Sequence, residues 1–534
     1  MARLRASAAG VGVLWIVVLA LALAPGNGRA AGTARRAGGP AAPRGAVAGT
    51  GLERLERQVQ EFTLANGLRF LLVERHDAPV FSFQSVVNAG SANDQVGTTG
   101  LAHMMEHMAF KGTPWVGTKD AAAERPLLDA EERTYAALAT ERSRLPRPDS
   151  TRLRAREAEF AAAERAAEAT VETEEFVRIL ERAGAKDLNA STSSDVTAYT
   201  CSLPSNRLEL WAAMEGGRLA HPVFREFYKE REVVIEERRM RTESSPFGRL
   251  LEEFVHAAFS AHPYGFGTIG FPSDLESFSR TQGEAFFHRY YVASNITIAV
   301  VGDVTLPELR AVAERYFTDI PAGPPPPGIA TIEPPQRAER RAILEDAAQP
   351  MVLVGWHVPA SSDPRYVAYQ ALADLLGGGD HARLQKALVK DEKIAVDVET
   401  TTGFPGEKFP SLWGVLSVPA VGVPPDSVER EVCRVIDDVV TKHPLTQAEL
   451  DGYKVRVRAQ KLGAVERNGA LANELSMAQT LHGDWREFFR DQDRVQALTP
   501  ADLADAMQLA FTRTNRTTAM IVPPAAADST SGAH

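Results

Sequence analysis

The stretch GLAHMMEHMAF, residues 100–110, places two histidines four positions apart and a glutamate directly before the second. On an α-helix, positions i and i+4 lie on the same face, so the imidazoles of His103 and His107 can converge on one ion. Glu106 projects from nearly the same side. The pattern predicts a helix that carries a metal site with a carboxylate beside it; two unrelated histidines on a surface helix are the alternative.

Imidazole and carboxylate ligands suit zinc, and three protein ligands leave one coordination position open for water. Zinc lowers the pKa of a bound water from about 16 toward about 7, and a neighbouring carboxylate can then accept its proton. We therefore expect one zinc ion per chain, with Glu106 as the general base if it is not itself a ligand. The third ligand has to come from another element of the fold.

The segment KEREVVIEE, residues 229–237, supplies two acidic candidates for that third ligand. Glu230 and Glu237 lie seven positions apart, which is two helical turns, so they share one stripe of a helix. A carboxylate on a partly apolar stripe needs a cation or a hydrogen-bond donor. The spacing leaves open which of the two glutamates is the ligand, and a solvated helix face is the simpler alternative.

Length and charge bound the class of protein. With 534 residues, 44% of them hydrophobic, the chain can bury more than one domain core. Its net charge of −10 argues against a nucleic-acid partner, because neutralising phosphates requires clustered Lys and Arg.

The N-terminus has the pattern of a secretory signal peptide over residues 1–31. Arg3 and Arg5 precede an apolar run at 11–24, and small residues follow it. That run is short for a bilayer span, and no later stretch is long and apolar enough, so we expect a periplasmic or secreted protein without a stable membrane span. Cys201 and Cys433 are the two cysteines; free thiols are favoured, although one bridge is possible.

Strand-like runs grouped in hairpins, such as 62–64 and 68–73 around Asn66-Gly67, alternate with helical segments. This order favours an α+β fold of two similar domains, each with an antiparallel-rich mixed sheet packed with helices. The expected organisation is a signal peptide (1–31), a flexible mature N-terminus (32–59), a metal-binding domain (60–320) with a helical hairpin insertion at about 120–182, a Pro-rich linker (321–345), a second domain without the histidine pair (346–522) and a disordered tail (523–534).

Five ordered motifs resemble the pitrilysin and insulinase family of zinc peptidases, and the size of the chain resembles the mitochondrial processing peptidase and its bacterial relatives. The motifs are GSANDQVGTTGLAHMMEHMAFKGT (90–113), LNASTSSDVTAYTCSLP (188–204), EREVVIEERRM (230–240), HPYGFGTIGFPSDL (262–275) and YYVASNITIAVVGDV (290–304).

The resemblance implies a role for each site residue. His103, His107 and Glu237 correspond to the zinc ligands, Glu106 to the general base, and Glu230 to a residue that supports the site without binding the metal. The family's interval between histidines and third ligand is shorter, and the insertion at 120–182 matches the surplus. Asn189, Ala190, Ser191 and Thr192 resemble the edge strand that aligns an extended substrate peptide, where main-chain hydrogen bonds give sequence-tolerant affinity.

One departure from the family pattern concerns the second half. Relatives of this size form two-chain clamshells, and a complete pair needs an Arg and a Tyr, seven residues apart, that contact the substrate and the oxyanion. Here Val389 and Val396 stand in those positions, and no Tyr lies in 384–403. A valine cannot stabilise developing negative charge. We therefore expect a heterodimer with a paralogous chain that carries the pair, in preference to a homodimer.

Two other classes of function are compatible with parts of this pattern. A binding or assembly protein that keeps the peptidase fold without turnover is favoured by Val389 and Val396, but not by the intact metal motif. A zinc hydrolase of non-peptide esters or amides is disfavoured by the strand at 189–192, which suits an extended chain.

Overall fold

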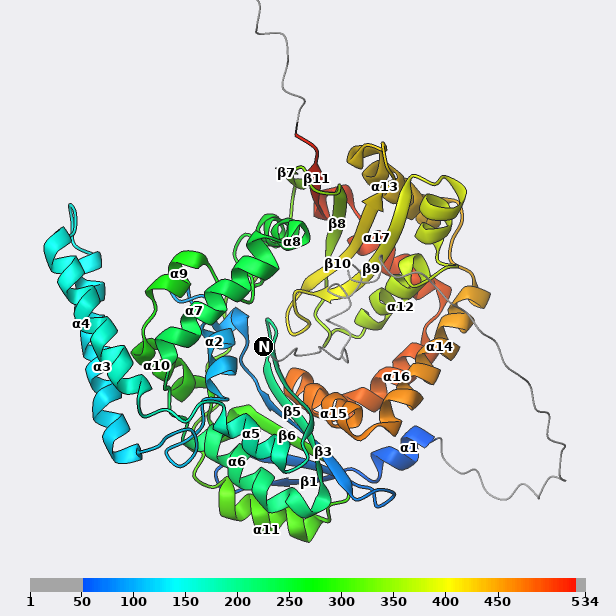
Figure 1. The fold of residues 1–534 in the computed structure, drawn as a ribbon. Coiled ribbons are helices and arrows are strands. Elements are labelled where there is room, and N and C mark those ends of the chain that lie inside the picture. Colours follow the sequence, from blue (N-terminus) through cyan, green and yellow to red (C-terminus); the bar gives the residue numbers. More distant parts are fainter. Residues whose placement is uncertain (1–50, 525–534) are drawn as a thin grey trace, which may run out of the picture.

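The computed structural model describes residues 51–524, in which two mixed β-sheets are each packed with helices (Figure 1). The expected α+β class is confirmed. The predicted signal peptide, residues 32–50 of the predicted flexible stretch and nearly all of the predicted tail lie outside the described residues.

The first sheet has six strands in the order β1-β2-β6-β3-β5-β4. Only β2 and β6 pair in parallel, and the hairpin expected around Asn66-Gly67 joins β1 to β2. β4 is an edge strand that pairs with β5 alone. The strands are β1 Gln60–Thr63, β2 Arg69–Glu74, β3 Val80–Val87, β4 Lys186–Thr192, β5 Thr197–Pro204 and β6 Ile296–Gly302.

The second sheet has five strands in the order β7-β11-β8-β10-β9, with only β7 and β11 parallel. Its strands are β7 Arg340–Glu345, β8 Met351–Val358, β9 Ala395–Phe404, β10 Ser411–Pro419 and β11 Arg516–Val522. β7 occupies the last six residues of the stretch 321–345 that was expected to be linker. The prolines end at Pro335, so nothing after that point prevents a strand from donating its backbone N–H groups.

Seventeen α-helices are described in residues 51–524. Those of the first half are α1 Gly51–Glu56, α2 Leu101–Met108, α3 Ala121–Arg142, α4 Ser150–Glu168, α5 Glu175–Arg182, α6 Leu208–Ala220, α7 Phe227–Arg238, α8 Pro246–Ala258, α9 Pro272–Ser277, α10 Arg280–Tyr290 and α11 Leu306–Tyr316. Those of the second half are α12 Tyr366–Gly377, α13 Pro425–Thr441, α14 Gln447–Glu466, α15 Asn468–His482, α16 Glu487–Ala497 and α17 Pro500–Ala510.

Helix α1 lies inside the segment 32–59 that was expected to be flexible. Its Leu52 and Leu55 are buried in a cluster with residues of α15 and α16. This contact joins segments more than 400 positions apart, so local composition, which is rich in Gly and Ala just before α1, could not reveal it.

The two halves exchange helices. Helix α15 of the second half packs against β3 and β6 of the first sheet, and α8 of the first half packs against β11, β7 and β8 of the second (Figure 1). Each contact is apolar: Leu475 lies in one cluster with Val73 and Val301, and Phe254 lies in another with Leu353. The apolar cluster on each sheet therefore includes a helix from the other half of the chain.

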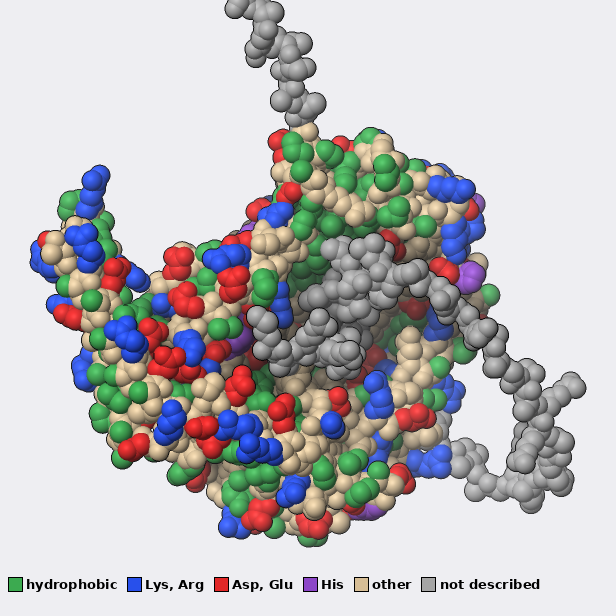
Figure 2. All heavy atoms as spheres, viewed as in Figure 1, with side chains coloured by type: hydrophobic (Ala, Val, Ile, Leu, Met, Phe, Trp, Pro, Cys, Tyr) green, Lys and Arg blue, Asp and Glu red, His purple; other side chains and the backbone are tan. Residues whose placement is uncertain are grey.

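Helices α3 and α4 form an arm that projects away from the rest of the molecule (Figures 1 and 2). The side chains of Asp120 and Asp149 accept hydrogen bonds from the first backbone N–H groups of each helix, which fixes where both helices begin. At the tip Leu145 is 92% exposed, whereas Tyr135 at the base is buried. The arm occupies the region where the sequence predicted a helical hairpin.

Two further observations concern the environment of the chain. No helix within residues 51–524 combines the length and the apolar character that a bilayer crossing requires. Cys201 is buried on β5 and Cys433 is half-buried on α13, and both thiols are free.

Candidate metal centre

Helix α2 carries the histidines, and its first turn is fixed by a buried carboxylate. Asp94 accepts hydrogen bonds from the backbone N–H groups of Gly100, at 2.8 Å, and Ala102, at 3.0 Å. Gly100 has φ = 94°, and a Cβ at this position would lie 2.3 Å from the carbonyl oxygen of Ile269. Only glycine fits there, so the residue that begins the motif also sets the direction of the helix.

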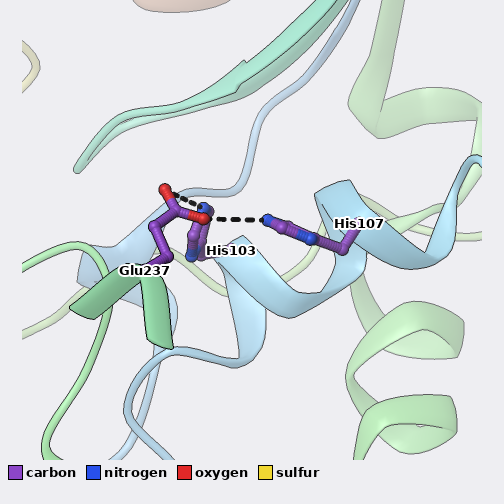
Figure 3. Close-up of side chains that lie close together, drawn as sticks. All are labelled: His103, His107 and Glu237. Atoms are coloured by element: carbon purple, nitrogen blue, oxygen red, sulfur yellow. Dashed lines mark ion pairs between the residues drawn. The ribbon is translucent and has the colours of Figure 1, made fainter. Parts of the chain in front are cut away.

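His103, His107 and Glu237 converge, as predicted, although they come from two elements (Figure 3). His103 Nε2 lies 3.7 Å from Glu237 Oε1, and His107 Nε2 lies 3.4 Å from Glu237 Oε2. The side chains are 7%, 20% and 15% exposed in that order, so solvent reaches the cluster mainly beside His107. α7 delivers Glu237 because Phe227 and Val234 pack into the first core.

The second acidic candidate, Glu230, lies on the far side of His107. Its Oε2 is 3.2 Å from His107 Nδ1, the ring nitrogen that points away from Glu237. A carboxylate at Nδ1 holds the proton there and leaves Nε2 for a metal. The Lys111 ammonium in turn forms ion pairs with Glu230 and Glu226. Of the two glutamates that helical spacing left open, Glu237 is thus the one between the histidines.

Glu106 lies beside the cluster and contacts β4. Its Oε2 accepts a hydrogen bond of 2.6 Å from the hydroxyl of Thr192, the last residue of that strand. Asn189, Ala190, Ser191 and Thr192 all lie on β4, where they pair with residues of β5 along one side only. The residues predicted to bind substrate therefore form the edge of the first sheet next to Glu106.

Burial and charge set the protonation of the cluster. Burial lowers the pKa of His103 to about 4. Burial acts in the same direction on His107, but its hydrogen bonds to Glu230 and Glu237 outweigh it and raise its pKa to about 9. Burial raises the pKa of Glu106, against the hydrogen bond from Thr192. Without a metal, a proton on His107 balances the Glu237 carboxylate, whose pKa falls to about 2 despite burial.

The three residues fit a zinc ion. Two ligands about 2.1 Å from a tetrahedral ion lie about 3.4 Å apart, and the two imidazole–carboxylate separations are 3.4 and 3.7 Å. Two imidazoles with one carboxylate also match the donors that zinc prefers. His103 is neutral at pH 7, as a metal ligand has to be, whereas His107 has to give up a proton when a metal binds.

The sequence interpretation did not anticipate two charged neighbours of the site. Arg241, in the π-helical turn η5 (Arg239–Glu243), places Nη1 2.9 Å from Glu237 Oε1. Lys111 contacts Glu230, as described above. Each follows a site residue by four positions, Arg241 after Glu237 and Lys111 after His107, so helical spacing was a usable signal for both.

Val389 and Val396, both in the second half, lie in different secondary-structure elements. Val389 is part of the π-helix η8 (Gln385–Asp391), and Val396 is 55% exposed on β9. Neither side chain has a hydrogen-bond donor to offer a neighbouring group.

Two family models match the chain. The one described as Insulinase (Peptidase family M16) matches residues 69–123, which include both histidines and Glu106. The one described as Peptidase M16 inactive domain matches residues 277–456, which begin in the first half and extend through most of the second sheet.

Relatives cover most of the chain. The zinc protease PqqE of Helicobacter pylori is 26% identical over 476 residues, which span 87% of this chain and 93% of that protein. A protein of Mycobacterium tuberculosis that is named an uncharacterized zinc protease is 24% identical over 453 residues, spanning 82% of this chain and 87% of the relative.

Solved structures agree with the fold. A protease from Helicobacter pylori has a TM-score of 0.72 at 25% identity and covers 87% of this chain and 99% of its own. A peptidase M16 inactive domain from Pseudomonas fluorescens, at 18% identity, has a TM-score of 0.70 and covers 88% and 98%. The family models matched at the histidine motif and over residues 277–456, together with the zinc-protease relatives that cover most of the chain, show that the chain is similar to the insulinase family, peptidase family M16.

Proposed function

We propose that this chain is the catalytic subunit of an exported zinc endopeptidase that acts on extended or unfolded peptides. The observation that carries the proposal is the convergence of His103, His107 and Glu237 beside Glu106, at the free edge of β4. A metal site of this composition next to a carboxylate and an unpaired strand edge combines the parts that peptide hydrolysis needs.

In this proposal His103, His107 and Glu237 hold one zinc ion. When bound, zinc lowers the pKa of water and polarises the scissile carbonyl. Glu106 accepts a proton from the attacking water and delivers it to the leaving amine, and burial raises its pKa, which makes the carboxylate a stronger base. Glu230 orients His107 through Nδ1.

The substrate segment lies along β4 as an added strand. The outer side of Asn189, Ala190, Ser191 and Thr192 has no strand partner among residues 51–524, so their backbone groups are available to a peptide. Main-chain hydrogen bonds of this kind accept many sequences, provided that the peptide is extended. Most strands of a folded protein already pair within its own sheets, which is why we assign unfolded peptides.

A partner chain completes the site. Val389 and Val396 offer no donor to a developing oxyanion, so we assign that role to a paralogous subunit in a heterodimer. Export to the periplasm agrees with the predicted signal peptide. The Escherichia coli PqqL structure, described as a periplasmic protease, has a TM-score of 0.63 with this chain at 17% identity, and this chain covers 47% of it.

The experiment pairs metal analysis with cleavage of a quenched fluorescent peptide. Purified chain, with and without its candidate partner, is assayed as wild type, as Glu106→Gln and as Glu236→Gln, a control on the exposed side of α7. We expect one zinc per chain in all three, and a loss of about 10²- to 10⁴-fold in turnover for Glu106→Gln alone. Zinc loss in Glu106→Gln, or unchanged turnover, contradicts the assignment.

A non-catalytic binding protein with the same fold is the second candidate. It is favoured by Val389 and Val396 and by the description of the family model matched at 277–456 as an inactive domain. Peptide binding without cleavage, in a zinc-loaded chain with its partner present, would establish this alternative.

A further inference from the structure

Beyond the metal centre, the turn that joins β4 to β5 receives a loop from the second half of the chain. Asp195, at the centre of that turn, is 6% exposed. Its Oδ2 accepts hydrogen bonds from the backbone N–H groups of Glu407, at 2.7 Å, and Lys408, at 3.1 Å. These two donors lie between β9 and β10 of the second sheet, so one buried carboxylate bridges the two halves.

The other oxygen of Asp195 is held by Tyr264, in the segment HPYGFG of the first half. The Tyr264 hydroxyl donates to Oδ1 and accepts from the backbone N–H of Phe409, at 3.3 Å. Burial raises the pKa of Tyr264, so its hydroxyl stays protonated and keeps donating. Both carboxylate oxygens therefore have partners, and none of these three partners is on β4 or β5.

The loop from the second half fits this place closely. A Cβ at Gly406 would lie 2.5 Å from the Tyr264 hydroxyl oxygen and 2.7 Å from Asp195 Oδ2, so no larger residue can occupy that position without displacing them. Beside it, Lys408 Nζ donates to Asn88 Oδ1 at 2.6 Å, just beyond the end of β3. The contact thus has steric, hydrogen-bonded and charged components.

The turn is connected directly to the site. Asp195 follows Thr192 by three residues, and Thr192 donates to Glu106. Along the same strand lie the backbone groups to which we assign the substrate. A shift of the turn would therefore move both the edge that receives a peptide and the hydroxyl that contacts the general base.

We infer that Asp195 is a positioning residue through which the second half of the chain holds the β4–β5 turn, and with it the substrate edge, in place. This inference rests on the proposed function for the role of β4 in substrate binding. The contact between Asp195 and the second half does not depend on that role. The second half, which has no metal motif, thereby supports the site. Its loop 403–409 fixes the position of the β4–β5 turn, which pairing with β5 on one side does not fix by itself.

The test uses the full chain without metal, and the variants Asp195→Asn and Asp149→Asn. Asn keeps the size of Asp195, but it replaces one acceptor oxygen with a donor that faces other donors. Asp149 is the matched control: its carboxylate also accepts two backbone N–H groups, from Thr151 and Arg152, and it lies on the arm, away from β4 and from the partners of Asp195.

Hydrogen exchange over residues 186–199 is the first readout. We expect Asp195→Asn to accelerate exchange there by about tenfold, equivalent to about 1.4 kcal/mol, and Asp149→Asn to leave this segment unchanged. Unchanged exchange in Asp195→Asn, or equal acceleration throughout both sheets, overturns the inference.

Affinity for a fluorescein-labelled unfolded peptide is the second readout, measured by anisotropy in the Glu106→Gln background. A rise in Kd with Asp195→Asn and not with Asp149→Asn supports the inference. If the parent chain binds no peptide at all, the proposed function fails, whereas the exchange result still decides the role of Asp195. If the parent binds and Asp195→Asn binds equally well, the inference fails alone.

Discussion

Glu237 lies close to both histidines of the site and to the charged side chain of Arg241. Its carboxylate faces both histidine Nε2 atoms and, at 2.9 Å, the guanidinium of Arg241. Arg241 is 64% exposed, so it has room to turn toward solvent. A divalent ion between the imidazoles would compete with this arginine for the same oxygen, because both are cations near one negative charge.

Replacing Arg241 with alanine should therefore tighten zinc binding. The pair is partly exposed and screened, so the expected gain is about 0.5–1 kcal/mol, or about two- to fivefold in Kd. Titration with zinc against a chromogenic chelator at low salt measures it. Arg239→Ala is the matched control, because Arg239 pairs with the exposed Glu236. Weaker zinc binding by Arg241→Ala would show that the arginine supports the ligand instead of competing for it.

How far the site could be predicted is best judged at single residues. Helical spacing placed His103 and His107 together, because a local period fixes which face a residue occupies. It could not choose between Glu230 and Glu237, which share a stripe; the choice depends on how α7 packs against α2, a contact between segments more than a hundred positions apart. Thr192 was expected to bind substrate, but its hydrogen bond to Glu106 arises only when β4 meets α2.

At the scale of elements, the arm of α3 and α4 separates into a buried base and an exposed tip. Tyr135 donates to the carbonyl oxygen of Ser277 and receives the Arg231 guanidinium at its hydroxyl, while Phe160 of α4 packs against its ring. The tip projects away from the body and has no such support (Figure 2). Good helix formers on both sides of a Pro-rich turn predicted two helices here, but not which end carries the structural role.

Tyr135→Ala should therefore destabilise the chain, and Leu145→Ala should not. Removing a buried aromatic ring costs about 3–5 kcal/mol, whereas an exposed substitution stays within about 0.5 kcal/mol. Urea unfolding followed by circular dichroism compares the two variants with wild type. A similar loss of stability in both would indicate that the tip is buried in solution against something other than residues 51–524.

At the scale of the whole molecule, each half contributes a helix that packs on the sheet of the other half. α15 covers Leu71, Val73, Ala299 and Val301 of the first sheet, all fully buried, and α8 covers the second sheet in return. The alternation of strands and helices predicted two similar sheets, and the structure has them. The packing of α15 on the first sheet could not be predicted, because the sequence of residues 468–482 does not indicate which sheet their apolar face contacts.

This exchange predicts that neither half folds alone. A cut after Gly328, a position where an added Cβ would meet no other atom within 4 Å, yields fragments 51–328 and 329–524, each with one complete sheet. Without α15, the first fragment exposes a continuous apolar face, and such faces cause association in water. We expect the separate fragments to aggregate or bind a hydrophobic dye, and the co-expressed fragments to form a soluble complex.

The intact chain should accordingly unfold in one calorimetric transition, with equal calorimetric and van't Hoff enthalpies. Leu475→Ala, in the α15 contact, should lower the midpoint of that single transition by removing about 2–5 kcal/mol, because the methyl groups it loses lie in the apolar cluster with β2 and β6. Val421→Ala, at a fully exposed position, is the control. Two separate transitions in the wild-type chain would contradict this prediction, as would a fragment 51–328 that is monomeric and melts cooperatively. Either result would show that each sheet is stable without the helix from the other half.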